Sequence, residues 1–175
     1  TGFGAKKKAV LVAYGIKVDG RRELIDFVVT TAESEKKWWR FLNDLHSRGL
    51  TGDALGLVVM DGNRGLENAV DLVWAFVKRQ RCWAHKLRNV ANYLKKKHLD
   101  QCIKGARAIY NAKNRKEAEK AYGRWEKKWR PIAPKAVRCL EKDLDELLHF
   151  YSCPKEIWIK VRTPNVIERA FREVR

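Results

Sequence analysis

The sequence predicts an α/β protein in which a core of mixed strands and helices is interrupted late in the chain by helices alone. Two strand-like runs flank the Asp19-Gly20 dipeptide, a short apolar run covers residues 55–60, and residues 98–153 show only helical periodicity. With 175 residues, 45% of them hydrophobic, the chain is long enough for one ordinary globular core.

The first half is predicted to open with a β-hairpin and continue into a helix. The run AVLVAYGIKVDGRRELIDFVV contains Asp-Gly, the dipeptide that most readily supplies the positive φ of a hairpin turn. The helix that follows has Ser34 as its N-cap and Gly49 as its stop. One face of this helix carries the large apolar residues Trp38, Phe41, Leu42 and Leu45.

A strand, a helix, a second strand and a second helix are expected next. Residues 55–60 form a short apolar run, typical of a strand buried on both faces, that ends at Asp61-Gly62. Residues 64–77 have helical spacing, residues 75–82 are predicted as a strand, and a helix should begin near residue 84.

The last part of the chain is predicted to be helical. One apolar stripe contains Ala118, Tyr122, Trp125 and Trp129, and a second contains Val137, Leu140, Leu144 and Leu147. Pro131 and Pro134 mark the break between them. A final helix is expected near TPNVIER, with Asn165 as its cap.

The charge distribution predicts a polyanionic partner, and nucleic acid before a membrane surface. The net charge is +17, and residues 78–98 carry eight Lys or Arg and no acidic residue. No apolar run reaches 18 residues, and the four cysteines are too widely spaced for a disulfide framework. We therefore expect a soluble intracellular protein without a membrane span.

The stretch RQRCWAHKLRN places Cys82 and His85 three positions apart among positive charges. This spacing could supply two zinc ligands, but a closed structural site needs four and usually a second close pair. The other cysteines, Cys102, Cys139 and Cys153, are scattered singly. The residues alone leave open whether the pair binds metal, packs in the core or has another local role.

Three segments together resemble the signature segments of Mutator-type transposases of insertion sequences: VVMDGNRGLENAV, QRCWAHKLRNV and NVIERAFREVR. The likeness also includes the opening KKAVLVAYGIKVDGRRELIDFVV and the WWRFLNDLHSRGL helix. The resemblance implies a ribonuclease H-like core, an all-helical insertion before the last catalytic residue, and a DDE active site with two Mg²⁺ or Mn²⁺ ions. It divides the chain into a catalytic core of residues 1–97 and 154–175 and an insertion of residues 98–153.

The family's functional residues can be transferred where the motifs match. Asp61 corresponds to the second catalytic aspartate and Glu168 to the final glutamate, both of them metal ligands, while Cys82 and His85 form the C-x-x-H motif beside the active site. The first aspartate has no match and is expected upstream of Thr1. Carboxylates suit this role because Mg²⁺ prefers oxygen ligands, and paired metals stabilise the attacking and leaving oxygens of phosphoryl transfer.

Structural roles for the same two carboxylates remain open. Asp61 precedes a glycine, so it could be a turn residue or the N-cap of the next helix. Glu168 follows Asn165 at capping-box spacing, so its side chain could cap the last helix instead of binding metal.

The implied partners are double-stranded DNA in the form of terminal inverted repeats and target DNA, bound by a homodimer or larger assembly. The expected location is the prokaryotic cytoplasm, at the nucleoid. Two other functions remain possible, namely a ribonuclease H-like nuclease or resolvase and a non-catalytic, domesticated DNA-binding protein. For Trp83, burial is the alternative to base stacking. The candidate DNA contacts are Lys78, Arg79, Arg81, Trp83, Lys86, Arg88, Lys95, Lys96 and Lys97.

Overall fold

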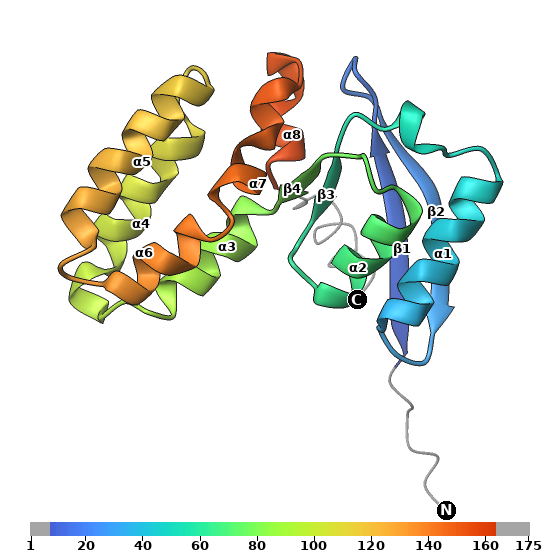
Figure 1. Cartoon of the computed structure of the whole chain (residues 1–175), viewed down its shortest axis with the longest axis horizontal. Helices are drawn as coiled ribbons and strands as arrows, with labels where there is room; N and C mark the ends of the chain where they lie inside the picture. Colours follow the sequence, from blue (N-terminus) through green and yellow to red (C-terminus); the bar gives the residue numbers. More distant parts are fainter. Residues whose placement is uncertain (1–7, 164–175) are drawn as a thin grey trace, which may run out of the picture.

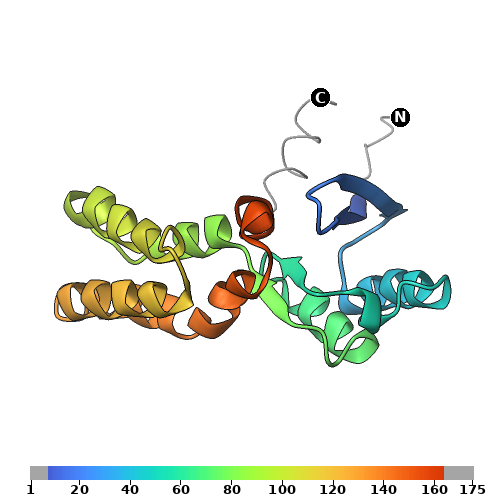
Figure 2. The same cartoon turned by 90° about the horizontal axis from the view of Figure 1, so that it is seen from above.

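The computed structural model describes residues 8–163, which form a mixed α/β part and a helical part on opposite sides of a short parallel strand pair (Figures 1 and 2). Each part has its own buried core. The first core extends from Leu11 to Trp74 in the sequence, and the second from Trp83 to Val161. The α/β class predicted from the sequence is confirmed.

The predicted hairpin consists of β1 (Ala9–Ile16) and β2 (Arg22–Thr30), paired antiparallel. Gly20 adopts φ 81° in the connecting turn, as expected of Asp-Gly in a hairpin. Leu11, only 1% exposed, belongs to the first core. The cross-strand pairs Val10–Val29 and Val12–Phe27 alternate with it and therefore lie on the other face of the hairpin.

Helix α1 (Glu35–Ser47) follows the hairpin and buries Phe41, Leu42 and Leu45, as its spacing predicted. Ser34 occupies the N-cap position, but its hydroxyl forms no capping hydrogen bond. Gly49 has φ 107°, a left-handed conformation that suits glycine at the end of a helix. A short 3₁₀ turn, η1 (Gly52–Ala54), leads into the parallel strands.

The parallel pair consists of β3 (Val58–Met60) and β4 (Arg79–Arg81), connected by α2 (Arg64–Val73). Both strands are shorter than predicted, and α2 ends before residue 77. Helix α2 ends here because Trp74 leaves helical geometry, with φ −135°, and is buried at 5% exposure. Its indole N–H donates a hydrogen bond to the Leu50 carbonyl at 3.0 Å.

The helical part begins at Trp83, close to the helix start expected near residue 84, and the buried residues of this first helix belong to the second core. Residues 98–153 contain no strand, in agreement with their periodicity. The helices and 3₁₀ turns are α3 (Trp83–Ala91), α4 (Lys96–Tyr110), α5 (Arg115–Trp129), α6 (Pro134–Glu141), α7 (Leu144–Leu148), η2 (His149–Ser152), η3 (Lys155–Ile157) and α8 (Trp158–Val161).

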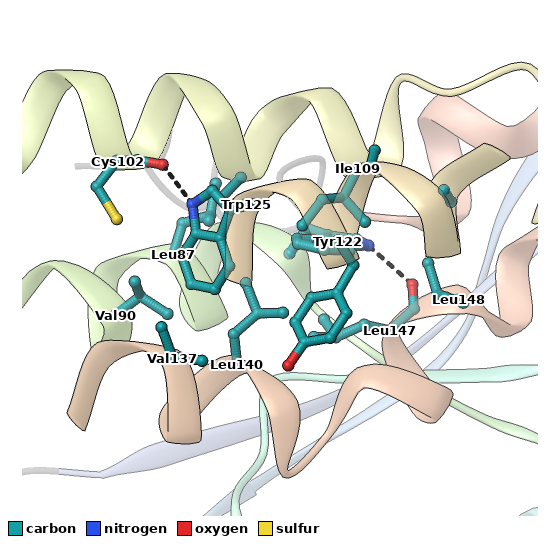
Figure 3. Packing of buried hydrophobic residues seen from close by; sticks show 14 of the residues in the cluster. Leu87, Val90, Cys102, Ile109, Tyr122, Trp125, Val137, Leu140, Leu147 and Leu148 are labelled. Atoms are coloured by element: carbon teal, nitrogen blue, oxygen red, sulfur yellow. Dashed lines mark hydrogen bonds between the residues drawn. The ribbon is translucent and has the colours of Figure 1, made fainter. Parts of the chain in front are cut away.

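Both predicted apolar stripes meet inside this part (Figure 3). Trp125 is 4% exposed, and its indole N–H donates to the Cys102 carbonyl at 2.9 Å, which joins α5 to α4. Leu140 and Leu147 are fully buried against them. Within residues 8–163, no helix has both the length and the apolar character needed to cross a membrane.

Candidate active site and basic surface

The parallel strand pair brings Asp61 and the C-x-x-H motif to one edge of the structure. Met60 pairs with Arg81 at the end of the ladder, and the Cys82 amide donates a hydrogen bond to the Met60 carbonyl at 2.9 Å. Asp61 and Cys82 therefore follow directly after the carboxyl ends of two neighbouring parallel strands. In α/β sheets, this edge is where ligands usually bind.

Asp61 is exposed and is held by a local turn. Its Oδ1 accepts a hydrogen bond from the Asn63 amide at 3.0 Å, which is the geometry of an Asx-turn. Asn63, and not Asp61, caps α2 by accepting a hydrogen bond from the Leu66 amide at 3.1 Å. Of the structural alternatives for Asp61, the turn is confirmed and the N-cap is excluded.

Gly62 allows the chain to turn sharply after Asp61. It has φ 96°, and a Cβ at this position would lie 2.7 Å from Nη1 of Arg81. A side chain here would be strained by the backbone and would also displace Arg81. The Asp-Gly sequence therefore places the Asp61 carboxylate at the strand end while the Arg81 side chain passes close to Gly62.

Cys82 and His85 form a helix cap. Cys82 is 1% exposed and is the N-cap of α3, where its Sγ accepts from the His85 amide at 3.5 Å. The His85 ring is also close, with Nδ1 3.1 Å from that sulfur. In the part of the chain that the structure describes, no three His, Cys, Asp or Glu side chains are grouped to hold a metal ion. The two side chains therefore have a local role at the start of α3.

Arg81 is the centre of an ion cluster that the sequence did not reveal. Its side chain, 17% exposed, pairs with Glu67 of α2, with Glu146 of α7 at 2.8 Å, and with Asp143 at 3.6 Å. Burial alone would lower the pKa of Arg81, but the hydrogen bond that it donates to Glu67 and the charges of Asp143 and Glu146 raise the pKa above its ordinary value. The cluster joins the α/β part to the helical part.

Two predicted DNA contacts are corrected by burial. Trp83 is 0% exposed, and its indole N–H donates to the Leu147 carbonyl at 2.8 Å, so the ring cannot stack on a base. Lys86 is 8% exposed and pairs with the buried Asp143, so its ammonium group is not available to phosphate. Both side chains instead secure α3 against the end of the helical part.

Among the other predicted cations, two form ion pairs at the junction of the two parts and five have exposed side chains. Arg81 is occupied by the cluster, and Arg79 pairs with Asp71 at 2.6 Å and with Glu146 at 3.1 Å. Charges neutralised in this way contribute little to an external phosphate. The exposed predicted DNA contacts are Lys78, Arg88, Lys95, Lys96 and Lys97.

Glu168 and its possible cap Asn165 lie outside the described residues. The described chain nevertheless reaches the site, because the Trp83 amide donates a hydrogen bond to the Arg162 carbonyl at 3.0 Å. The Arg162 backbone therefore lies beside Trp83, the first residue of α3, which directly follows Cys82.

The fold and this site define an α/β protein with an acidic strand end beside a strongly basic helical part. The chain belongs to the Mutator family of transposases, because the family described as "Transposase, Mutator family" matches residues 3–175. The resemblance seen in the sequence motifs is thereby confirmed.

Individual transposases agree over nearly the whole chain. It is 39% identical over 166 residues to the transposase for insertion sequence element IST2 of Acidithiobacillus ferrooxidans, covering 95% of this chain and 56% of that protein. It is 38% identical over 170 residues to the transposase for IS6120 of Mycolicibacterium smegmatis, covering 97% and 52%. For the transposase of IS256 in transposon Tn4001 of Staphylococcus aureus, the identity is 31% over 170 residues, covering 96% and 43%. The chain thus spans about half the length of the relatives it matches.

Proposed function

We propose that this chain is the catalytic part of a DDE-type DNA transposase that cleaves and joins DNA strands at the ends of an insertion sequence. The observation that carries the proposal is the position of Asp61, an exposed carboxylate directly after a parallel strand and beside the C-x-x-H motif. Membership of the Mutator family supports this function over an unrelated nuclease. The DNA substrates would be terminal inverted repeats and target DNA, bound by a dimer or larger assembly.

A ribonuclease H-like core is the fold that we propose for the α/β part. The described strands form two separate two-stranded sheets, β1–β2 and β3–β4, but Leu11 of β1 and Met60 of β3 share one core. A further strand between β1 and β3 would join the two pairs into one mixed sheet. We assign this place to the strand expected to carry the first catalytic aspartate, which would put that residue next to Asp61.

The donor chemistry at this edge fits Mg²⁺ or Mn²⁺. Asp61 offers carboxylate oxygens, which hard divalent cations prefer, and within residues 8–163 no Lys or Arg forms an ion pair with it. Glu67, the nearby acidic residue of α2, is already paired with Arg81. Asp61, Glu168 and the upstream aspartate would therefore hold the metals, which when bound supply charge stabilisation for in-line displacement at phosphorus.

Each of the chain's own residues would have a distinct role in this arrangement. The Asn63 amide fixes the orientation of Asp61, and Met60, 2% exposed, anchors the strand behind it. The Arg162 carbonyl, which accepts a hydrogen bond from the Trp83 amide, places the end of the described chain at the start of α3. Glu168 follows Arg162 by six positions in the sequence.

The test is metal-dependent cleavage by a protein that contains this chain and the segment preceding it. Asp61→Asn and Glu168→Gln keep side-chain shape but remove a charge from the metal site, so cleavage of terminal-repeat DNA in Mg²⁺ should fall to background. Asp53→Asn, an exposed aspartate of η1, is the matched control and should remain active. Binding to the same DNA should survive in all three variants.

Two outcomes would contradict the proposal. Full cleavage by Asp61→Asn would refute the transposase site. Full cleavage by Glu168→Gln would show that Glu168 is a cap, because glutamine completes a capping box as well as glutamate does.

A further inference from the structure

A groove of about 620 Å³ lies between α3 and α6, outside the edge that carries Asp61. α3 and α6 pack directly against each other through the second core. Arg81, already held by the ion cluster, lies at one end of the groove. The remaining lining residues are Lys86, Asn89 and Tyr93 of the α3 side and Lys135, Arg138, Cys139, Lys142 and Asp143 of the α6 side.

The α6 wall of the groove carries three uncompensated positive charges. Lys135, Arg138 and Lys142 are exposed, and none of them has an acidic partner among residues 8–163. Some cations elsewhere in the helical part are paired, as Arg130 is with Glu126 at 2.7 Å and Glu141 at 2.8 Å. The three unpaired cations therefore leave this wall strongly positive.

The floor of the groove does not cancel that charge. Lys86 and Asp143 pair with each other there, and Lys86 also donates to the Cys139 carbonyl at 3.2 Å. Because the pair is internally neutral and nearly buried, it shapes the groove without offering a charge to a ligand. An anion in the groove would meet the α6 row first.

The spacing of the α6 row matches a nucleic-acid backbone. Lys142 still has helical geometry, with φ −51° and ψ −36°, so the row lies on one face at positions i, i+3 and i+7. At 1.5 Å rise per residue, the seven steps from Lys135 to Lys142 span about 10.5 Å. Four successive phosphates of one strand of B-DNA, separated by three steps of about 3.4 Å, cover about 10 Å of its axis. Each cation can therefore face a different phosphate.

The α3 wall adds polar groups of the kind that contact phosphate and sugar. Asn89 and Tyr93 are both exposed, and Tyr93, at 52%, is unusually open for a large aromatic side chain. Amide and phenol donors at such positions fix the register of a bound duplex without reading its sequence. The two walls thus combine charge with hydrogen bonding.

We propose that the α3–α6 groove binds the phosphate backbone of one strand of the DNA, with Lys135, Arg138 and Lys142 on three different phosphates within a run of four. The inference rests on the proposed function only in taking DNA as the partner. In this arrangement the main phosphate contacts of the region lie on α6, whereas the buried Lys86 of α3 makes none. The sequence signal that could have indicated these residues is their helical spacing in PKAVRCLEK.

The test compares two charge-matched triple variants of this chain. Lys135→Gln/Arg138→Gln/Lys142→Gln removes the row, whereas a control with the same charge change neutralises the exposed α5 residues Lys116, Arg124 and Lys127. Binding to a duplex is measured without Mg²⁺ between 50 and 200 mM salt. The salt slope is the decrease in log affinity with log salt concentration, and loss of three phosphate contacts should reduce it by about 2.7. Between 50 and 200 mM salt, the groove variant should therefore lose roughly 40-fold less affinity than the wild-type chain loses. The control should keep the wild-type slope.

Cysteine footprinting gives an independent readout in the unmodified protein. Cys139 lines the groove and Cys153 lies elsewhere in the helical part, and both are partly exposed. Bound DNA should slow alkylation of Cys139 and leave that of Cys153 unchanged. Equal protection of both, or of neither, would overturn the assignment.

The remaining outcomes separate the groove from the proposed function. A wild-type slope in the groove variant, or equal losses in both triple variants, would refute the groove while leaving DNA as the partner. Absence of DNA binding by the wild-type chain at 50 mM salt would refute both. If polyglutamate bound the wild-type chain as tightly as DNA, an acidic protein would be the better partner and the proposal would fail.

Discussion

The ion pair between Lys86 and Asp143 gives the sharpest stability test, because its two members are not equally replaceable. Both side chains are 9% exposed. Asp143→Asn leaves the Lys86 ammonium buried with neutral oxygen acceptors, the new amide and the Cys139 carbonyl, and without an anionic partner. Lys86→Met leaves Asp143 with Arg81, whose Nε lies 3.6 Å from its carboxylate.

The expected magnitudes follow from these remaining partners. Breaking a buried pair by removing one member costs about 3–5 kcal/mol when the other charge is left uncompensated, and we expect this range for Asp143→Asn. At an effective dielectric constant of about 20, a unit charge pair at 3.6 Å attracts by roughly 4–5 kcal/mol. Because Asp143 keeps this attraction, Lys86→Met should cost only about 1–2 kcal/mol. The double variant should be no less stable than Asp143→Asn alone, since it contains no unpaired buried ammonium.

Urea unfolding of the two single variants and the double variant measures these differences. Equal costs for the two single variants would refute the asymmetry. DNA binding provides a second check, because a lysine that contacts phosphate contributes about 0.9 to the salt slope. Lys86→Met should leave that slope unchanged, and a decrease would show that Lys86 reaches DNA after all.

Two further predictions concern the helical part. Lys95, Lys96 and Lys97 lie at the N-terminus of α4, where cations oppose the helix dipole. Changing all three to Gln should therefore raise the melting temperature by about 2 °C at low salt. The same change should weaken DNA binding, and unchanged binding would exclude the three lysines as contacts. Burial raises the pKa of Tyr151 to about 12, against the opposing charge of Arg162. Because the unfolded chain loses the phenol proton first, stability should fall as pH rises from 10 towards 12, and Tyr151→Phe should reduce that fall in unfolding measurements at each pH.

The ion cluster around Arg81 extends from α2 to the floor of the groove. The Arg81 side chain passes close to Gly62, the residue that follows Asp61. Its Nε lies 2.8 Å from the Glu146 carboxylate and 3.6 Å from the Asp143 carboxylate. Asp143 in turn holds Lys86 at the floor of the groove. A continuous set of ion pairs therefore connects Glu67 of α2 with the floor of the groove across the junction of the two parts.

Local features of the chain were sufficient to predict much of the fold. Asp19-Gly20 predicted the hairpin turn because the conformation it requires is set by the residues of the turn themselves. The spacing of Phe41, Leu42 and Leu45 and of the Trp125 stripe predicted which helix faces are buried, because helical period depends only on the backbone. The Mutator motifs likewise predicted the family, and they singled out Asp61, Cys82 and His85, which lie at one edge.

Only the tertiary structure decided which charges face outward and which strand ends meet. Lys86 and Lys135 are both helical lysines in a basic sequence, yet one pairs with Asp143 in the interior and the other lines an open groove. The sequence left base stacking open for Trp83, but its indole N–H is bonded to the carbonyl of Leu147, a residue distant in sequence. Sequence alone determines local conformation and periodicity, whereas burial and ion pairing depend on contacts between distant segments, which form only when the two parts pack together.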